Sequence, residues 1–381
     1  MRLAPSDEQQ ELARAVRQLV DRRAAALGTR AAATSDLGYD DILWKTLCTQ
    51  IGGAALAIPQ EYGGAGATLL ESHVILEQLG ATLTPTPYLG SAILAAQAVL
   101  GAAGAEHRER LLPALADGTV GALAWADGTG RWRTDGAGVR ATPAGRDTGT
   151  STGTCDGGWR LSGRSTLVLD GSYAAILLAV AETPDGLGLF EVDPASPGVT
   201  RIRVRALDLT LDLATVAFDQ VPAVALTSED ARVGPALRHL HAVAATAVTA
   251  LQVGGAQRAL DRTVRHLRDR VQFGRPLGSF QALKHRAADM FVAVETSRSM
   301  SWAAAWAAAH DPADLPLRAA LAKAWCSEAF AAVAGESIQL HGGIAITWED
   351  DTQLYFKRAH ATGQLFGQAH EHRKLLLDDP H

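Results

Sequence analysis

The stretch from Arg270 to Gln281 gathers the side chains needed to bind a phosphate diester and a planar ring together. A fixed cation, amide donors and two aromatic rings can contact both parts of such a ligand. These groups are Arg270, Gln272, Phe273, Phe280 and Gln281. Gly274, Pro276 and Gly278 interrupt the helical periodicity here, so we expect a tight loop between two helices. Taken alone, such a loop could also be a solvated interhelical turn.

A second pattern suited to phosphate follows about sixty residues later, as Gln339-Leu340-His341-Gly342-Gly343. Two glycines remove side chains, so that backbone amides can approach a pyrophosphate, and Gln339 adds an amide donor. The alternative for this pattern alone is a helix that ends at Gly-Gly.

Together these motifs resemble those of the acyl-CoA dehydrogenase family. The Arg270-x-x-Phe273-Gly274 string, the downstream Phe280-Gln281 and the Gln-x-x-Gly-Gly motif match position by position. An Ile58-Pro59-Gln60-Glu61-Tyr62-Gly63-Gly64 segment also resembles a signature of the family's N-terminal domain. The resemblance covers nearly the whole chain. It implies FAD as cofactor, an acyl-CoA substrate, α,β-desaturation and an electron-transfer acceptor.

The resemblance also assigns roles to the two motifs. In the family, the adenosine-pyrophosphate half of FAD is held largely by a neighbouring subunit, through these motifs. We therefore expect a cofactor site formed by residues of both motifs: Arg270, Gln272, Phe273, Phe280, Gln281, Gln339, Gly342 and Gly343.

The motifs that would contact the flavin ring are replaced. The family has a Thr-Glu-Pro-Gly-Ala-Gly-Ser-Asp-like string where this chain reads Ala124–Arg131. Leu167 and Leu169 stand where a Trp and a Thr would face the flavin. A leucine side chain cannot donate a hydrogen bond, so we expect these two residues to be part of the core of a strand.

The catalytic base of the family is also missing. Phe366 and Ala244 occupy the two positions where the family places its glutamate. Glu371 lies one turn beyond the first position and is a weak substitute, as is Asp230. The chain also offers histidines as bases, although histidines near helix ends more often neutralise the helix dipole. They are His239, His241, His370 and His372.

These losses predict the catalytically incomplete subunit of a heteromeric, steroid-type acyl-CoA dehydrogenase with two copies of each chain. The partner would supply the glutamate, the flavin-ring contacts and the acyl pocket. One alternative is a self-sufficient homotetramer with a displaced base. Another is a non-enzymatic scaffold subunit, which would not need Arg270, Phe273, Gln281 or Gln339.

The elements that position these residues form three regions of an α+β chain. Helical periodicity predicts an all-helical N-terminal domain over 1–120 and a C-terminal four-helix bundle over 229–381, with a β domain over 121–228 between them. The four helices of the bundle are expected at 234–268, 280–310, 315–340 and 349–376. The Gly- and Thr-rich stretch 142–158 is expected to be an excursion without a core.

Composition excludes several other classes of protein. The 381 residues carry a formal net charge of −6, with no basic excess that suggests nucleic acid. The longest uncharged run, Gln78–Ala105, contains two prolines and several polar residues, so no membrane span is expected. The N-terminus lacks a secretory pattern, and the cysteines lack metal-ligand spacing. Cys48, Cys155 and Cys326 are therefore expected to be reduced thiols in a cytoplasmic protein.

Overall fold

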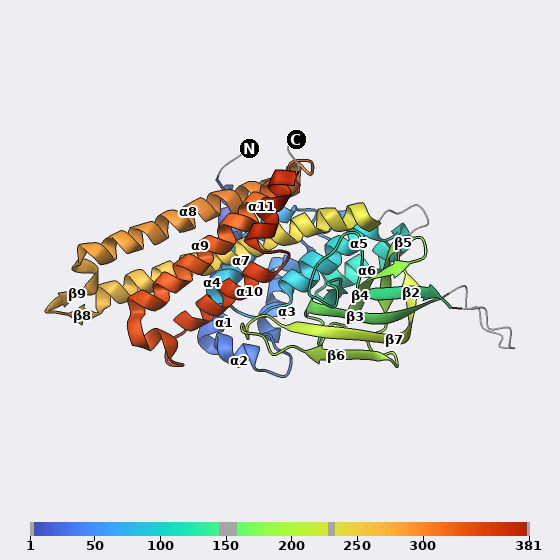
Figure 1. Ribbon diagram of the computed structural model, residues 1–381, viewed down its shortest axis with the longest axis horizontal. Coiled ribbons are helices and arrows are strands. Elements are labelled where there is room, and N and C mark those ends of the chain that lie inside the picture. Colours follow the sequence, from blue (N-terminus) through green and yellow to red (C-terminus); the bar gives the residue numbers. More distant parts are fainter. Residues whose placement is uncertain (1–3, 145–157, 228–232, 379–381) are drawn as a thin grey trace.

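The computed structural model describes residues 4–144, 158–227 and 233–378. The chain begins with helices, continues as a sheet and ends with long helices, as Figure 1 shows. This order confirms the predicted fold class. The N-terminal helices are α1 Asp7–Ala26, α2 Thr29–Ala33, α3 Asp41–Ile51, α4 Leu69–Thr82, a π-helical turn at Tyr88–Ala95, α5 Ala96–Ala102 and α6 Ala105–Ala116.

Local sequence explains where these helices begin. Ser6 caps α1 and exchanges hydrogen bonds with Gln9, and Thr68 and Glu71 form the same capping box at the start of α4. The prolines and glycines of the segment from Ile58 to Gly66 predict no regular element, but it contains a short 3-10 turn, Gln60–Tyr62. Three residues suffice for such a turn, so the glycines around it do not prevent it.

The middle region is a seven-stranded sheet. Its strands are β1 Gly121–Ala124, β2 Val139–Pro143, β3 Trp159–Leu169, β4 Ile176–Thr183, β5 Gly186–Val192, β6 Val199–Arg203 and β7 Leu213–Ala225. The path runs β1-β4-β2-β3-β7-β5, and β5 pairs with β4, which closes the strands into a barrel. Short apolar runs bounded by turn residues predict five of these strands, at 159–163, 174–180, 188–192, 199–204 and 215–219. They miss β1 and β2, because each is short and borders Gly-rich sequence. The excursion predicted for 142–158 falls mostly outside the described residues.

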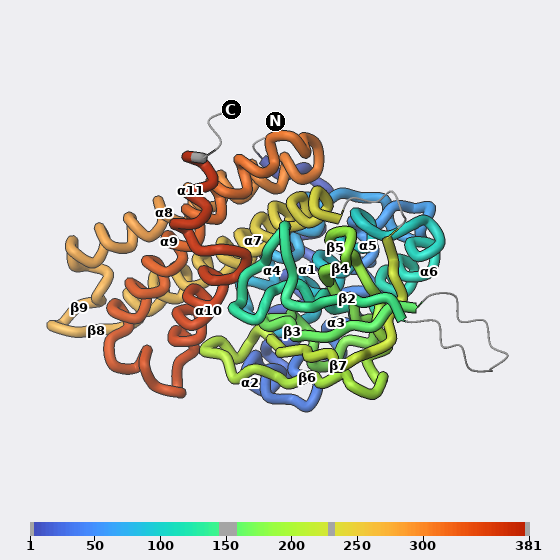
Figure 2. Tube along the Cα trace, turned by 45° about the vertical axis from the view of Figure 1, so that its right-hand side comes forward, coloured from blue at the N-terminus to red at the C-terminus, as the bar shows by residue number. Residues whose placement is uncertain are grey.

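The C-terminal region contains the three longest of the described helices, α7, α8 and α9, which lie side by side (Figures 1 and 2). The helices of this region are α7 Val233–Asp269, α8 Gln281–His310, α9 Leu315–His341, α10 Thr352–Gln364 and α11 Ala369–Asp378. One hydrophobic core includes Ile75 of α4, Leu178 of β4 and Leu251 of α7. The three regions therefore share apolar packing, which fixes their relative positions.

The prediction of one helix over 349–376 was wrong. The chain forms α10 and α11 instead, joined at Phe366 and Gly367, which have φ angles of 54° and 99°. The left-handed backbone at these residues cannot continue a right-handed helix. The C-terminal region therefore has five helices among its described residues, not four.

Two further expectations concern membranes and thiols. Among the described residues, no helix combines the length and the apolar character that a membrane crossing requires. Cys48 is half-buried and Cys326 is buried, and both are free thiols. Cys155 lies outside the described residues.

Candidate functional site

The loop between α7 and α8 is a small hairpin at one tip of the molecule (Figure 1). Strand β8 Val271–Gln272 pairs with β9 Arg275–Pro276, and the turn residues Phe273 and Gly274 have φ angles of 53° and 74°. Such a two-residue turn requires positive φ angles and therefore favours glycine. The Leu277 amide donates to the Arg270 carbonyl at 2.9 Å, which closes the base of the hairpin.

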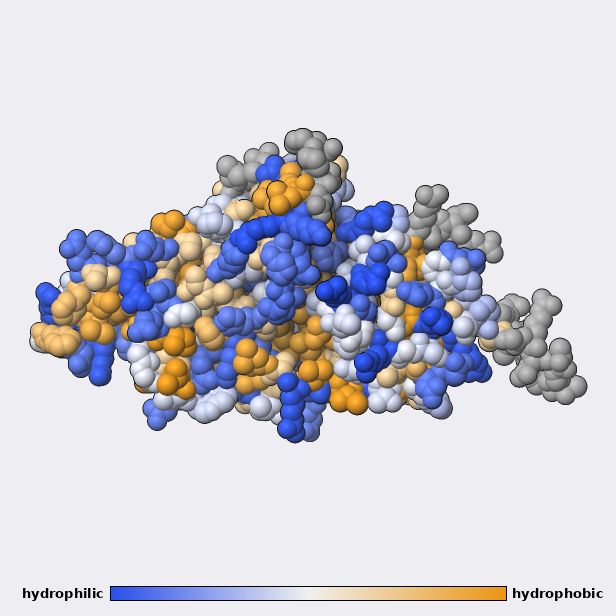
Figure 3. All heavy atoms as spheres, viewed as in Figure 1, coloured by the Kyte–Doolittle hydropathy of each residue, from blue (hydrophilic) through white to orange (hydrophobic). Residues whose placement is uncertain are grey.

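The aromatic rings of the hairpin face outward. Phe273 and Phe280 meet edge to face with centroids 6.0 Å apart, and the Arg275 guanidinium lies 3.9 Å from the centroid of the Phe280 ring. Phe273 is 89% exposed. Figure 3 shows apolar atoms at this tip among charged ones. An exposed ring at a hairpin tip is costly in water and is typical of a surface that is covered in a complex.

The Gly-Gly motif lies at the end of α9. Gly342 ends the helix with a φ of 68°, and its amide donates to the Ile338 carbonyl. No other part of the described structure comes within 4 Å of the space that a side chain would occupy at Gly342 or Gly343. Both glycines and Gln339 are exposed, so the backbone here is open to a ligand from outside.

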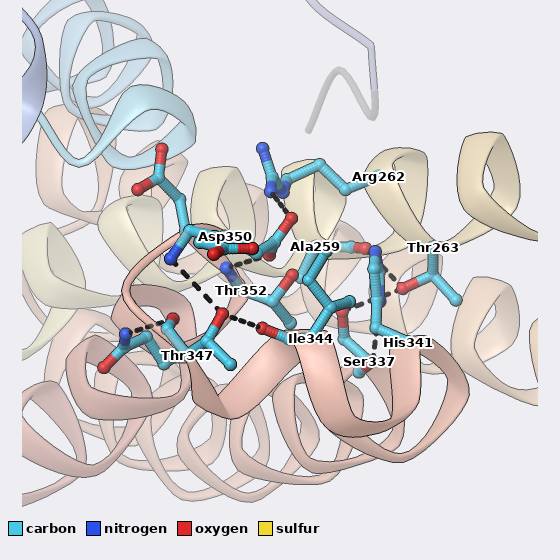
Figure 4. A network of polar contacts seen from close by, with 12 residues as sticks. Ala259, Arg262, Thr263, Ser337, His341, Ile344, Thr347, Asp350 and Thr352 are labelled. Carbon is cyan, nitrogen blue, oxygen red and sulfur yellow. Dashed lines mark hydrogen bonds and ion pairs between the residues drawn. The ribbon is translucent and has the colours of Figure 1, made fainter.

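Polar contacts join the ends of α7 and α9 (Figure 4). The His266 and His341 rings stack with centroids 4.5 Å apart, and Thr263 Oγ1 donates to Ser337 Oγ at 2.8 Å. Nδ1 of His341 donates to the Ser337 carbonyl at 2.7 Å. Burial, and then the charges of His341 and Arg270, lowers the pKa of His266. Because α7 leads directly into the hairpin, these contacts place both predicted motifs at the same end of the helices.

The predicted cofactor residues therefore form an open surface and not a closed pocket. Phe280 is half-buried, and the other seven predicted residues are exposed. Cations, amide donors, open glycine amides and aromatic rings fit the diphosphate and adenine of a dinucleotide. A partner surface is needed to enclose such a ligand, because buried contact over most of its surface is typical of tight sites.

In the region that would face a flavin ring, several hydrogen-bond donors make contacts within the loop at Asp127. Oδ1 of Asp127 accepts from Thr129 N at 2.8 Å, Thr129 Oγ1 at 2.7 Å and Arg131 N at 3.1 Å. The Gly130 amide donates to the Asp127 carbonyl at 3.0 Å. The loop is thus folded on itself, and these donors are not available to a ligand.

Leu167 and Leu169 lie at the end of β3. Leu169 is buried, whereas Leu167 is half-buried and has a φ of 52° within an irregular part of the pairing between β3 and β7. Neither side chain can contribute a polar contact to a flavin ring. These positions do not fit the ring half of FAD.

Phe366 fills the first of the two base positions. It is 0% exposed and packs against Trp132 and Trp125, with ring centroids 4.7 and 6.3 Å away. Trp132 comes from the loop before β2, so it meets Phe366 across the boundary between the sheet and the helices. Apolar rings occupy this space, and a charged base would be desolvated there.

The second predicted base position has no ionisable side chain. Among the candidate histidines His241 is half-buried and His372 is buried, whereas His239 is exposed on α7. Ala244 is fully buried in α7. Burial lowers the pKa of His241 and of His372 to about 4 each, and it also lowers the pKa of His239. Nε2 of His372 donates to the Phe366 carbonyl at 2.8 Å, so this ring holds the backbone.

The substitute acid Glu371 makes a structural contact. Glu371 is exposed, and its Oε2 accepts from the Gln368 amide at 2.8 Å, which caps α11. His370 is exposed on α11. Asp230 lies outside the described residues.

Sequence reasoning missed Lys323, a fully buried lysine in α9. Its Nζ donates to the Gly367 carbonyl at 2.9 Å, to the Gly363 carbonyl at 3.2 Å and to Ser327 Oγ at 3.1 Å. Burial lowers its pKa to about 7. Lys323 and His372 together hold the segment between α10 and α11, which contains Phe366. The sequence feature that could have identified this residue is a lysine among the apolar residues of α9.

Two family models match the chain. The model for the N-terminal domain of acyl-CoA dehydrogenases matches residues 6–119, and the model for their C-terminal domain matches residues 238–378. The acyl-CoA dehydrogenase IpdE2 of Mycolicibacterium smegmatis is 39% identical over 375 residues, which cover 97% of this chain and 98% of that protein.

Solved structures of similar proteins include heteromeric ones. A variant of the Tcur3481-Tcur3483 steroid ACAD has 34% identity and a TM-score of 0.85, covering 98% of this chain and 97% of that one. The ChsE4-ChsE5 complex from Mycobacterium tuberculosis has 28% identity and a TM-score of 0.86, with both chains fully covered.

Proposed function

The chain belongs to the acyl-CoA dehydrogenase family, and we propose that it is the subunit of a heteromeric enzyme that binds the adenine and pyrophosphate half of FAD for a partner chain. The reaction is α,β-desaturation of an acyl-CoA thioester. A carboxylate takes the α-proton in such a reaction, and bound FAD supplies the acceptor for the β-hydride. The electrons then pass to a separate electron-transfer acceptor.

The filled base position carries this proposal. Phe366 is buried among Trp125 and Trp132 where the family has its glutamate, and Ala244 is buried at the alternative position. A chain with neither carboxylate cannot remove the α-proton by itself. The base must come from a partner chain.

The exposed motifs give the chain its role toward that partner. Arg270 and Gln272 would hold phosphate oxygens, the amides near Gly342 and Gly343 would approach the pyrophosphate, and Phe273 and Phe280 would contact the adenine. The backbone amides of Thr129 and Arg131 in the Asp127 loop bond within the loop, so we expect the partner to hold the ring and the substrate. Such a shared site fits a symmetric oligomer with two copies of each chain.

The similar steroid ACAD suggests the class of substrate, a bulky acyl-CoA such as a steroid derivative. The rings of Phe366 and Trp132 leave this chain without its own acyl pocket at that position. Each pair of chains would then have a single acyl pocket, and we expect that pocket to accommodate a large substrate.

The test is to purify a tagged copy of this chain from its own cells. We expect a second acyl-CoA-dehydrogenase-like chain with a glutamate at one of the two base positions, and about one FAD for each two chains. The visible absorbance of the complex should bleach on addition of an acyl-CoA substrate. Replacing the partner's glutamate with glutamine should abolish bleaching, whereas Glu371→Gln in this chain should not.

Two outcomes would contradict the proposal. An active homo-oligomer with one FAD in each chain would favour a self-sufficient enzyme with a displaced base. A colourless heteromer would favour the scaffold. The chain expressed alone serves as the control and should be colourless and inactive.

A further inference from the structure

The segment from Gly342 to Asp351 carries the Gly-Gly motif but has little apolar burial to hold it. It begins as a 3-10 turn, Gly342–Ile346, and continues without regular structure to α10. Ile346 is 74% exposed and Trp348 is 61% exposed. Because its large apolar side chains face outward and only Ala345 is buried, we expect polar contacts at its two ends to define its position.

The near end is fixed by α7 and α9. His341 and Ser337 precede the glycines, and Thr263 of α7 bonds both to Ser337 and to the Ala259 carbonyl (Figure 4). These contacts set where the segment begins. They leave the direction that it takes after Gly343 undetermined.

The far end is fixed by Asp350, which reaches back to α7. Nη2 of Arg262 donates to Asp350 Oδ2 at 2.9 Å, and Oδ1 of Asp350 accepts from the Thr352 amide at 2.7 Å (Figure 4). Between these points, the Thr347 hydroxyl donates to the Ile344 carbonyl at 2.8 Å, and the Gln353 side chain donates to the Thr347 carbonyl at 2.7 Å. Asp350 thus connects the segment to the helix that leads into the hairpin.

Arg30, in α2 of the N-terminal region, holds the same end from the other side. Its guanidinium donates to the carbonyl of Asp350 at 3.0 Å, to Oδ1 of Asp351 at 2.6 Å and to the carbonyl of Trp348. The guanidinium also lies 5.2 Å from the centroid of the Trp348 ring, and the Lys357 ammonium lies 4.6 Å from it. A planar guanidinium that contacts three acceptors restrains a backbone more than a single contact does.

We propose that Arg30 and the Arg262–Asp350 ion pair are positioning residues for the Gly342-Gly343 backbone, so that the N-terminal region determines how well this half-site binds FAD. The inference rests on the proposed function. Neither arginine needs to touch the cofactor. Each would act by fixing the segment whose amides approach the pyrophosphate.

The physical reason is preorganisation. A segment that is held at both ends presents its amides in one arrangement, so binding does not require it to become ordered. Releasing the far end would leave the near-end contacts intact. It would let the glycine amides sample other directions. We therefore expect weaker FAD retention with little change in the stability of the whole chain.

The experiment uses the purified complex and follows FAD release by flavin fluorescence after dilution. Arg30→Ala and Asp350→Asn should each release FAD roughly tenfold faster than the parent, the size of effect commonly seen when a residue that supports a ligand-binding group is removed. Asp350→Asn keeps the oxygen that accepts from Thr352 and removes only the charge that pairs with Arg262. Arg30→Lys keeps a cation with three donors and should restore part of the loss.

Two further measurements separate positioning from general destabilisation. Hydrogen exchange should rise in peptides covering 342–351 and stay at the parent level in α1 and the sheet. The melting temperature of the apo complex should remain within about two degrees of the parent value, as is common for surface substitutions. The matched control is Arg22→Ala, since Arg22 is exposed on α1 and bonds within its own helix.

Failure of this inference differs from failure of the proposed function. The positioning role is overturned if Arg30→Ala and Asp350→Asn release FAD at the parent rate. It is also overturned if both variants lower the melting temperature of the complex without a rise in hydrogen exchange confined to 342–351. If the parent complex itself contains no FAD, the proposed function has failed, and the positioning role fails with it.

Discussion

At the scale of single residues, Phe366 is the clearest departure from the family chemistry. It does more than omit a carboxylate, because its ring packs with Trp132 and Trp125 and fills the space around the base position. Lys323 then holds the carbonyls of Gly363 and Gly367, and His372 holds the carbonyl of Phe366. Under the proposed function, a carboxylate restored at this position would therefore lie among aromatic rings.

This packing gives the first prediction. Phe366→Glu should not create an active site in this chain, because a buried carboxylate without a partner is strongly disfavoured. We expect a loss of roughly 3–5 kcal/mol in the free energy of unfolding, in the range of severe core substitutions. Denaturant unfolding measures the loss, with Phe366→Leu as the volume control. Gain of substrate-dependent flavin bleaching by the chain alone would contradict it.

At the scale of elements, α10 is fastened to the sheet region by a buried ion pair. Arg358 of α10 donates to the Asp208 carboxylate and, at 3.0 Å, to the Thr210 carbonyl, and both charged side chains are buried. Such a pair need not add much stability compared with apolar residues, but removing one partner leaves the other charge buried. The contact therefore determines where α10 lies relative to the sheet.

The second prediction concerns this pair. Arg358→Ala should lower the free energy of unfolding by about 3–5 kcal/mol, because Asp208 stays buried without its partner. Arg373→Ala is the matched control, since Arg373 pairs with Glu328 on the surface, and the stability of this variant should stay close to that of the parent. Urea denaturation of both variants gives the comparison. Equal losses would show that burial of the pair is unimportant.

At the scale of the whole molecule, buried titratable groups in different regions link stability to pH. Burial lowers the pKa of His73 in α4 to about 3, and that of His241 in α7 and His372 in α11 to about 4. The unfolded chain takes up these protons near pH 6.5, so each histidine reduces stability as pH falls from about 6.5 to about 4. Asp170 acts in the opposite direction, because burial raises its pKa to about 8.

The third prediction isolates one of these groups. His241→Phe removes a titrating ring and keeps an aromatic side chain against Trp125 and Phe366. Between pH 7 and pH 5 the variant should lose about 2 kcal/mol less stability than the parent. Chemical denaturation at both pH values measures the difference. His370→Gln, at an exposed position, should behave like the parent, and an unchanged pH slope in His241→Phe would refute the assignment.

The sequence alone determined the family, the order of helices and sheet, and the presence of a tight loop after α7, and it predicted the absence of a base. These features are local, since each depends on residue types at fixed spacings along the chain. Arg270, Phe273 and Gly274 lie within a few residues of one another, and their turn geometry follows from that spacing. The absence of carboxylates at positions 244 and 366 could likewise be counted from the motifs.

Only the tertiary structure decided the break between α10 and α11, the burial of Phe366 beneath Trp132, and the contacts of Arg30 with the Gly-Gly segment. The helical periodicity of 349–376 continues through the break and therefore does not reveal it. The break arises from the left-handed backbone at Phe366 and Gly367, which Lys323 and His372 hold. Arg30 and Asp351 are 321 residues apart in the chain. Contacts between such distant residues depend on how whole elements pack, and no local pattern records them.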